Sequence, residues 1–275
     1  MHPDAGDLAP GDEWAGRLDW QDIALHRVRS PADPRFERGY AALWNQFGEI
    51  GEMEQRDVIV ARLGWEPRQP IRGCALLYEM LVLERAGAMV AVRDHTAILP
   101  LDGHDATTIV HLSHALVLPS ERGTGLGAWL RALPLAAARE CAVRAGAGAR
   151  AVTLVAEMEP PDPAIAERVA RLRIYGRAGF RCVDPEHVRY VQPDFRAPAA
   201  IDATGVTPLP LALMIRRVGR EDQDTMPGAE ARGIARALYT MYGVQQREHD
   251  MAPLWPRLDE LPAADEQVRL LASVS

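Results

Sequence analysis

The sequence has 275 residues and no lysine, so all 31 of its basic residues are arginines. Its 38 acidic residues outnumber them, and the formal net charge is −7 at pH 7. A protein that binds nucleic acid through the phosphate backbone needs a basic surface, and this overall charge opposes one. We therefore expect no nucleic-acid partner.

Cysteines and long apolar runs are also scarce. The three cysteines, Cys74, Cys141 and Cys182, are spaced too widely for a disulfide framework or a zinc motif. We expect buried free thiols and no metal. No run approaches the roughly 18 apolar residues that span a bilayer, and the acidic amino terminus lacks the apolar segment of a signal peptide. These absences favour a cytoplasmic protein without a membrane partner.

The sequence does contain regular strand-like and helix-like patterns, and its 48% hydrophobic content suffices for a large core. Helical spacing predicts helices at 35–47, 53–65, 125–145 and 164–178. Alternating or continuous apolar patterns predict strands at 23–30, 80–84, 88–99, 107–118, 151–158, 188–195 and 208–218. This order predicts an α/β fold with a mixed sheet and crossover helices.

The two ends of the chain differ from this central part. Residues 1–22 are rich in Asp, Gly and Pro, which predicts a mobile amino-terminal arm unless Trp14 and Trp20 hold it against the surface. Residues 220–275 form a carboxyl-terminal extension with an amphipathic helix after Thr225 and Pro227, followed by a loose tail. The extension either covers a cleft or joins two subunits, so a homodimer stays open. The main domain is then 23–219.

A glycine-rich stretch, "PSERGTGLGAWL", joins the strand at 107–118 to the following helix. Glycines at such a turn let backbone N–H groups approach an anion. The segment from Gly123 to Ala128 formally fits a dinucleotide-binding loop, with Glu157 as the ribose-binding acid. However, residues 119–122 separate the strand from the turn, whereas a dinucleotide loop turns almost at once, so this interpretation is the weaker one.

The same stretch resembles the acyl-CoA loop of the GNAT superfamily of N-acetyltransferases. That signature is Arg or Gln, two residues, Gly, one residue, then Gly or Ala, and Arg122, Gly125 and Gly127 match it. Tyr175-x-x-x-Gly179-Phe180 is similar to a second signature of the family, in the expected order. The resemblance covers roughly 23–219 and implies the GNAT fold, a mixed and mostly antiparallel sheet flanked by helices.

The resemblance also implies a donor, a reaction and a binding site. The donor is acetyl-CoA, and the acetyl group passes directly to a primary amine of a small molecule or peptide, without an enzyme-bound intermediate. Tyr175 is the implied acid for the departing thiolate. A domain that binds acyl-CoA as a sensor, without transfer, is the alternative. The implied donor-binding residues are Leu116, Val117 and Leu118 for the pantetheine arm, and Arg122, Gly123, Thr124, Gly125, Leu126 and Gly127 for the pyrophosphate.

The base that accepts the amine proton is not part of the resemblance. We favour Glu157, at the end of a strand, and His114. His111 and His114 are three residues apart, so in a regular strand they face opposite sides and at most one lines the site. Asp94 and His95 are predicted to be a solvated strand end, with a hydrogen-bonded pair that orients the substrate as the alternative. The family's usual Asn before the tyrosine is missing, since the residues there are Glu167, Arg168 and Arg171.

Overall fold

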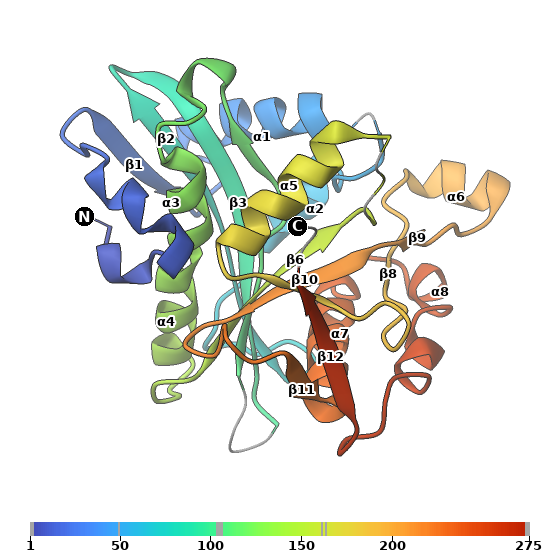
Figure 1. Ribbon diagram of the computed structural model, residues 1–275. Coiled ribbons are helices and arrows are strands. Elements are labelled where there is room, and N and C mark those ends of the chain that lie inside the picture. The colour runs from blue at the N-terminus through green and yellow to red at the C-terminus, as the bar shows by residue number, and fades with distance from the viewer. Residues whose placement is uncertain (1–2, 49, 103–106, 161, 163, 273–275) are drawn as a thin grey trace.

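The computed structural model describes residues 3–48, 50–102, 107–160, 162 and 164–272. Its main sheet is built from β1 (Ile23–Val28), β2 (Cys74–Arg85), β3 (Ala88–Pro100), β4 (Thr108–His111), β5 (Ala115–Val117), β6 (Val152–Met158), β7 (Arg181–Val183), β10 (Ala212–Arg217), β11 (Thr225–Pro227) and β12 (Gln267–Ala272). The order is β1-β2-β3-β4-β6-β10-β7-β12-β11, with β5 paired to β3 beside this path. In the described part of the chain, β4 with β6 is the one parallel pair. The predicted mixed, mostly antiparallel sheet is confirmed (Figure 1).

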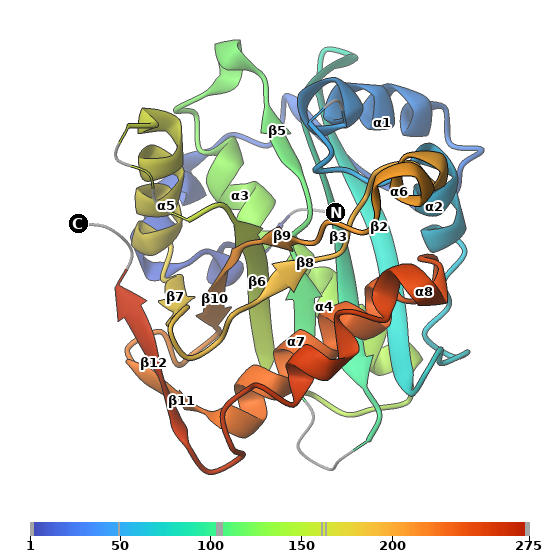
Figure 2. The same cartoon turned by 90° about the vertical axis from the view of Figure 1, so that its right-hand side faces the viewer.

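Helices cover both faces of the sheet. They are α1 (Pro34–Phe47), α2 (Arg56–Arg62), α3 (Leu126–Ala132), α4 (Pro134–Arg144), α5 (Ala166–Arg177), α6 (Pro198–Thr204), α7 (Gly228–Tyr242) and α8 (Glu248–Met251). Figure 2 shows α7 in front of the strands and α4 behind them. Side chains alternate along β2: Tyr78 and Met80 pack in the core with α1 and α7, whereas Leu77 packs in the core with α4 and α5. This double coverage explains the continuous apolar run of β2.

Several predicted elements are divided or shortened, among them the strand predicted at 208–218, which is split between β9 (Leu209–Pro210) and β10. The strand predicted at 107–118 is two strands, β4 and β5, interrupted at residues 112–114. The helix predicted at 125–145 is interrupted between α3 and α4, because Pro134 has no N–H to donate to the preceding turn. The strand predicted at 188–195 contributes only β8 (Val191–Gln192), which pairs with β9 (Leu209–Pro210) in a separate two-stranded sheet.

The amino-terminal segment is packed, whereas the sequence predicted a mobile arm. Apart from residues 1 and 2, which lie outside the described residues, it forms two short 3₁₀ helices, Ala5–Asp7 and Pro10–Arg17. Asp12 makes a buried ion pair with Arg131 of α3 at 2.7 Å. The indole N–H of Trp129 donates to the carbonyl of Ala15 at 2.9 Å. These partners lie more than a hundred residues away, so local composition could not reveal them.

The carboxyl-terminal extension belongs to the same body. Its predicted helix is present as α7. The tail predicted to be loose contains β12, which pairs with β7 and extends the main sheet, and β11 pairs with β12 in turn. Val268 and Leu270 of β12 are buried and alternate with more exposed residues, which is the pattern of a half-buried strand.

The three cysteines are free thiols, and Cys74 and Cys141 are buried as expected, while Cys182 is partly exposed. Among the described residues, no helix has both the length and the apolar character needed to cross a membrane. No group of three or more His, Cys, Asp or Glu side chains in that part of the chain is placed to hold a metal ion.

Candidate active site

The main sheet opens between β5 and β6. β4 lies parallel to β6, but after residues 112–114 the chain leaves β6 and β5 pairs with β3 alone among the described strands. The interruption has a visible cause: the backbone N–H of His114 donates to the Asp94 carboxylate at 2.9 Å instead of to a strand. One edge of Leu116 and Val117 therefore has no strand partner in the described chain.

The glycine loop follows β5 on one side of this opening. Gly123 and Gly125 have positive φ angles of 80° and 103°, a conformation that favours glycine. Among the described residues, none accepts a hydrogen bond from the five backbone N–H groups of residues 123–127. The side chain of Arg122 is exposed beside them. Consecutive unpaired N–H groups of this kind form an anion-binding concavity.

Tyr175 of α5 lies on the same side of the sheet as α3. Its hydroxyl accepts a hydrogen bond from Nη2 of Arg93 at 3.3 Å, and its ring packs edge-on against Phe180. Arg93 is fully buried on β3 and also donates to the carbonyl of Leu130 at 3.2 Å. The guanidinium of Arg131 lies 5.6 Å from the tyrosine ring. The tyrosine hydroxyl is thus held by a cation that no local sequence pattern indicated.

The amino-terminal segment borders this donor side. A Cβ built on Gly125 would lie 3.1 Å from the Cβ of Ala15, which is tighter than nearly all real contacts. A Cβ on Gly11 would lie 1.8 Å from the carbonyl oxygen of Arg177, at the end of α5. Two glycines therefore allow the segment to pack closely against both the loop and α5.

A cavity of about 80 Å³ is lined by residues from β4, from the strand break that follows it, and from β6, β8 and α7. Its polar lining includes His111, Ser113, His114, Glu157, Gln192 and Tyr242. The volume is well below the roughly 300–1,000 Å³ of a typical drug-sized pocket. This cavity has room for a small polar group and not for a large ligand as a whole.

Glu157 presents an ionised carboxylate to the cavity. Its Oε2 accepts hydrogen bonds from His111 Nε2 at 2.8 Å, the Tyr242 hydroxyl at 2.5 Å and Gln192 Nε2 at 3.2 Å. Its Oε1 is buried and has no hydrogen-bond partner among the described residues. Burial raises the pKa of this carboxyl, but the hydrogen bond from His111 outweighs burial and lowers the pKa below its ordinary value.

His111 is held at both ring nitrogens. Nε2 faces Glu157, and Nδ1 lies 3.0 Å from the Ser113 hydroxyl oxygen. A carboxylate can only accept, so we assign the ring proton to Nε2, which leaves Nδ1 to accept from Ser113. Ser113, His111 and Glu157 therefore form a continuous hydrogen-bonded chain that ends at the cavity wall.

His114 is held differently. Its Nδ1 lies 3.0 Å from Asp94 Oδ1, and its Nε2 lies 3.0 Å from the carbonyl oxygen of Glu52. Burial lowers the pKa of this imidazole, but the charge and hydrogen bond of Asp94 outweigh burial and raise the pKa to about 9. At neutral pH His114 is a cation that donates from both ring nitrogens, and it has no lone pair to offer.

Two expectations about these residues are wrong. His111 and His114 both line the cavity, because the strand is interrupted between them and the alternation of a regular strand does not apply. Asp94 and His95 are fully buried rather than solvated. Asp94 pairs with His114, whereas Nε2 of His95 lies 3.3 Å from the carboxylate of Glu79.

Sequence analysis also missed Arg93, Ser113 and Tyr242. Ser113 had one signal, a polar residue between two histidines in the otherwise apolar segment 108–118. Arg93 and Tyr242 lie in an apolar strand and on a helix of the extension, and no local pattern separates them from ordinary residues of those elements.

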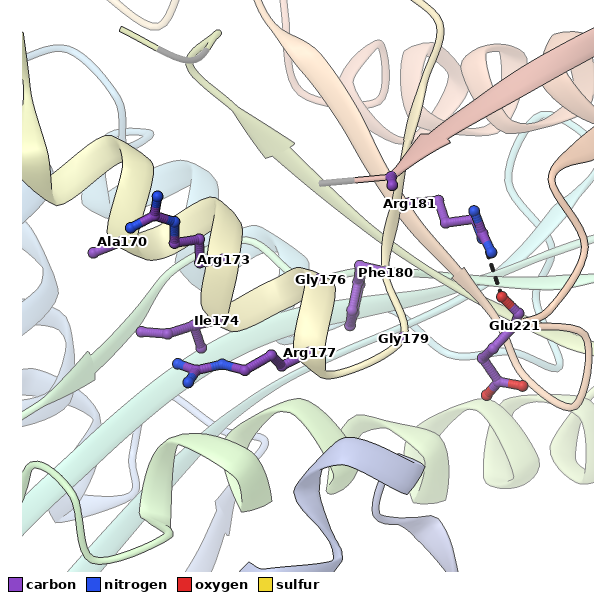
Figure 3. A pocket seen from close by; sticks show the side chains of 10 residues that line it. Ala170, Arg173, Ile174, Gly176, Arg177, Gly179, Phe180, Arg181 and Glu221 are labelled. Atoms are coloured by element: carbon purple, nitrogen blue, oxygen red, sulfur yellow. Dashed lines mark hydrogen bonds between the residues drawn. The ribbon is translucent and has the colours of Figure 1, made fainter. Parts of the chain in front are cut away.

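A larger groove, of about 620 Å³, lies between α5 and β7. Figure 3 shows Arg173 and Arg177 on one wall and Arg181 on the other, where Arg181 Nε donates to the backbone carbonyl of Glu221. The groove contains none of the site residues expected from the sequence except Gly179 and Phe180 of the second signature.

No protein-family model and no curated protein matches this sequence. Several solved structures are similar to it. A protein described as a GNAT-family acetyltransferase from Desulfovibrio desulfuricans is 17% identical, with 70% of this chain and 96% of that chain covered and a TM-score of 0.37. An acyl-CoA N-acyltransferase from Pseudomonas aeruginosa is 14% identical, covers 70% and 99%, and has a TM-score of 0.38. The aminoglycoside N-acetyltransferase AAC(6')-Iy, in complex with CoA, is 14% identical, covers 54% and 87%, and has a TM-score of 0.31.

Each of these three structures is described as an acetyltransferase or acyltransferase. These TM-scores lie below 0.5 and the identities below 25%. The case for function therefore rests on the residues of this chain.

Proposed function

We propose that this chain transfers an acyl group, with acetyl as the first choice, from acyl-CoA directly to the primary amine of a small-molecule or peptide acceptor. The observation that carries the proposal is the pair of half-sites beside the opening between β5 and β6. The loop with five unpaired N–H groups borders one half, and the cavity with an ionised, partly unpaired carboxylate forms the other.

The donor half suits coenzyme A. Its pyrophosphate would take the N–H groups of residues 123–127, at the positive end of α3. The pantetheine arm would add to the free edge of Leu116–Leu118 as a further strand does. Tyr175 would protonate the departing thiolate. Between an ordinary phenol, with a pKa of about 10, and an ordinary thiol, with a pKa of about 8.5, this transfer is uphill by about 2 kcal/mol.

The acceptor half suits an amine that arrives as an ammonium ion, which has a pKa of about 10.4. Glu157 Oε1 would bind this ammonium by a charge-assisted hydrogen bond. A proton would then pass from the amine to Ser113 Oγ, as Ser113 gives its own proton to His111 Nδ1. The nitrogen attacks the thioester carbonyl carbon, the C–N bond forms, the C–S bond breaks, and sulfur takes the Tyr175 proton. The second proton that the nitrogen loses as it becomes an amide goes to the Tyr175 phenolate, which restores the tyrosine.

This proposal keeps Tyr175 and Glu157 in catalytic roles and gives the proton to His111. His114 is already a cation near neutral pH, so we assign it to holding Asp94 and the strand break in place. The free thiols fit a reducing compartment, and we place the reaction in the cytoplasm.

Two measurements test the function. Acetyl-CoA at 100 times its dissociation constant should raise the free energy of unfolding by about 2.7 kcal/mol, whereas NAD should not. Acetyl-CoA with a panel of amines should give acetylated products, detected by mass. The Tyr175→Phe variant should keep the thermal shift and lose roughly a hundredfold to ten-thousandfold in transfer rate.

The outcomes separate the alternatives. Binding of acetyl-CoA without transfer to any amine would support the sensor instead. A thermal shift with NAD alone would support the dinucleotide interpretation. Tyr175→Phe with the wild-type rate would remove the tyrosine from the mechanism and leave the rest of the site standing.

A further inference from the structure

The carboxyl-terminal helix α7 brings its last residue, Tyr242, into the acceptor cavity. The helix lies across β2, β3 and β4 on the face opposite to α4 (Figure 2). Tyr242 is 1% exposed and lines the cavity although it lies outside the region that resembles the GNAT family. Its partner Glu157 is 85 residues earlier in the chain.

The hydroxyl of Tyr242 has a defined role in the hydrogen-bond network. It donates to Glu157 Oε2 at 2.5 Å, and its oxygen lies 3.3 Å from His111 Nε2. Three donors thus meet at Oε2. Among the described residues none makes a hydrogen bond to Oε1, and the nearby hydroxyl of Tyr190, which also lowers the pKa of this carboxyl, has no hydrogen-bond partner in that part of the chain either. This unequal distribution fixes the orientation of the carboxylate. A rotation by 180° would only exchange the two oxygens, and one of them would still lack a hydrogen-bond donor.

Packing alone does not account for a tyrosine at this position. The ring lies edge-on to His111 at 5.7 Å and 5.3 Å from the ring of Phe195, and a phenylalanine would make both contacts. A buried hydroxyl costs free energy unless it is hydrogen-bonded. Its compensating partner here is the carboxylate that we assign to the acceptor.

We propose that Tyr242 is a positioning residue of the acceptor half-site: its hydroxyl holds Glu157 Oε2 against His111 and leaves Oε1 for the ammonium of the acceptor. The proposal rests on the proposed function for the identity of that ligand. It makes the carboxyl-terminal extension part of the site rather than an added module.

Other charges surround this group and are common to every variant considered below. From α2, Arg62 lies 5.6 Å from the Tyr242 ring and forms an ion pair with Glu54. From the strand break come His114 and its partner Asp94. The remaining ionisable groups that face the cavity or its carboxylate are Glu52, Glu159, Arg171 and Tyr190. Burial raises the pKa of Tyr242 well above its ordinary value, so its hydroxyl remains a donor at neutral pH.

The expected effect concerns the protonation of the Glu157 and His111 pair. Without the hydroxyl of Tyr242, the carboxylate is less well stabilised, so the pair binds a proton more readily. A hydrogen bond to a charged group has the size that shifts a pKa by about one unit. In Tyr242→Phe, the apparent pKa of the pair should therefore rise by about one unit.

The experiment follows the His111 imidazole by NMR across pH, in the full chain without donor or acceptor. Tyr239→Phe is the matched control, since Tyr239 is also buried on α7 but stacks on Tyr190 and does not touch Glu157. We expect the midpoint to rise in Tyr242→Phe and to stay at the wild-type value in Tyr239→Phe. The acidic limb of the kcat/KM profile should move in the same direction.

An unchanged midpoint in folded Tyr242→Phe would overturn the proposal, as would an equal shift in the Tyr239 control. Should Tyr242→Phe not fold, Gln192→Met removes another donor from the same oxygen and should raise the midpoint by a smaller amount. An unchanged midpoint there would also overturn it. The titration does not depend on acyl transfer. An inactive wild-type protein would therefore count against the proposed function, whereas the titration would still test the role of Tyr242.

Discussion

The donor and acceptor half-sites are built from different kinds of chemical groups. The donor side consists of backbone N–H groups in a loop in which Gly123 and Thr124 are exposed and Gly125 and Leu126 are buried, and its glycines at 123 and 125 have positive φ angles. The acceptor side consists of buried ionisable side chains, in which Glu157 and Asp94 each have a cationic or hydrogen-bonding partner. A surface of backbone dipoles binds an anion without regard to pH. A buried network of acids and imidazoles depends on pH, and its members depend on one another.

The Glu157→Gln substitution should have the largest effect, and it should affect the acceptor half-site without affecting the donor half-site. The amide cannot carry the negative charge that binds the ammonium, so the transfer rate should fall roughly a hundredfold to ten-thousandfold. The affinity for acetyl-CoA, measured by calorimetry, should stay within a factor of about two, because the loop is untouched.

Glu159→Gln is the control for this change. Glu159 lies two residues further along, lines the same cavity and pairs with Arg168 at a partly exposed position. Loss of such an exposed pair costs no more than about 1 kcal/mol, and the rate should change little. Equal losses in the two variants would mean that the cavity requires negative charge in general and not this carboxylate.

The same difference explains how much of each half-site could be predicted from the sequence. The donor loop is one contiguous segment, and the spacing of its glycines indicates a tight turn. The sequence alone could therefore nominate Arg122–Gly127 as candidate donor-binding residues. The acceptor side is assembled from segments that only the tertiary fold brings together. Tyr242 could not be selected from its own helix, because its role depends on Glu157 in a distant strand.

The sheet follows the same rule. The apolar run of β6 and the alternation in β3 predicted strands within a residue of their true limits. The division at residues 112–114 could not be predicted, because it depends on Asp94 capturing the N–H of His114. The packing of the amino-terminal segment depended likewise on Arg131 and Trp129, which lie in another part of the chain.

A second prediction concerns pH and the buried pair of Asp94 and His114. The folded state raises the pKa of His114 from 6.5 to about 9, so the pair stabilises the fold fully below about pH 6.5. This contribution is lost as the pH rises through about 9. The shift corresponds to a few kcal/mol at most, about 3 kcal/mol by the usual conversion.

Asp94→Asn tests this window. The difference in unfolding free energy between wild type and variant, measured by denaturant titration, should be largest near pH 6 and should shrink steadily toward pH 9.5. A constant difference over that range would show that the aspartate acts through its hydrogen bonds to Tyr78 and the His114 backbone, without the imidazolium. The donor side has no buried imidazole, so the affinity for acetyl-CoA should follow the pH dependence of stability in neither the wild type nor the variant.

The smallest effect should come from Gly127→Ala on the donor side, where stability and binding should move in opposite directions. Gly127 is in the first turn of α3, and a Cβ there meets only Arg131 Nη1, at 3.9 Å. Alanine should therefore stabilise the fold by up to about 0.5–1 kcal/mol. Its methyl group would stand among the N–H groups that hold the pyrophosphate, so acetyl-CoA should bind about tenfold more weakly, close to the 1.4 kcal/mol that a factor of ten represents. Gly233→Ala in α7 has open space around its Cβ and should give the same stabilisation with unchanged binding. If both variants bind acetyl-CoA as the wild type does, the pyrophosphate does not approach the start of α3, and the donor must be held by another part of the loop.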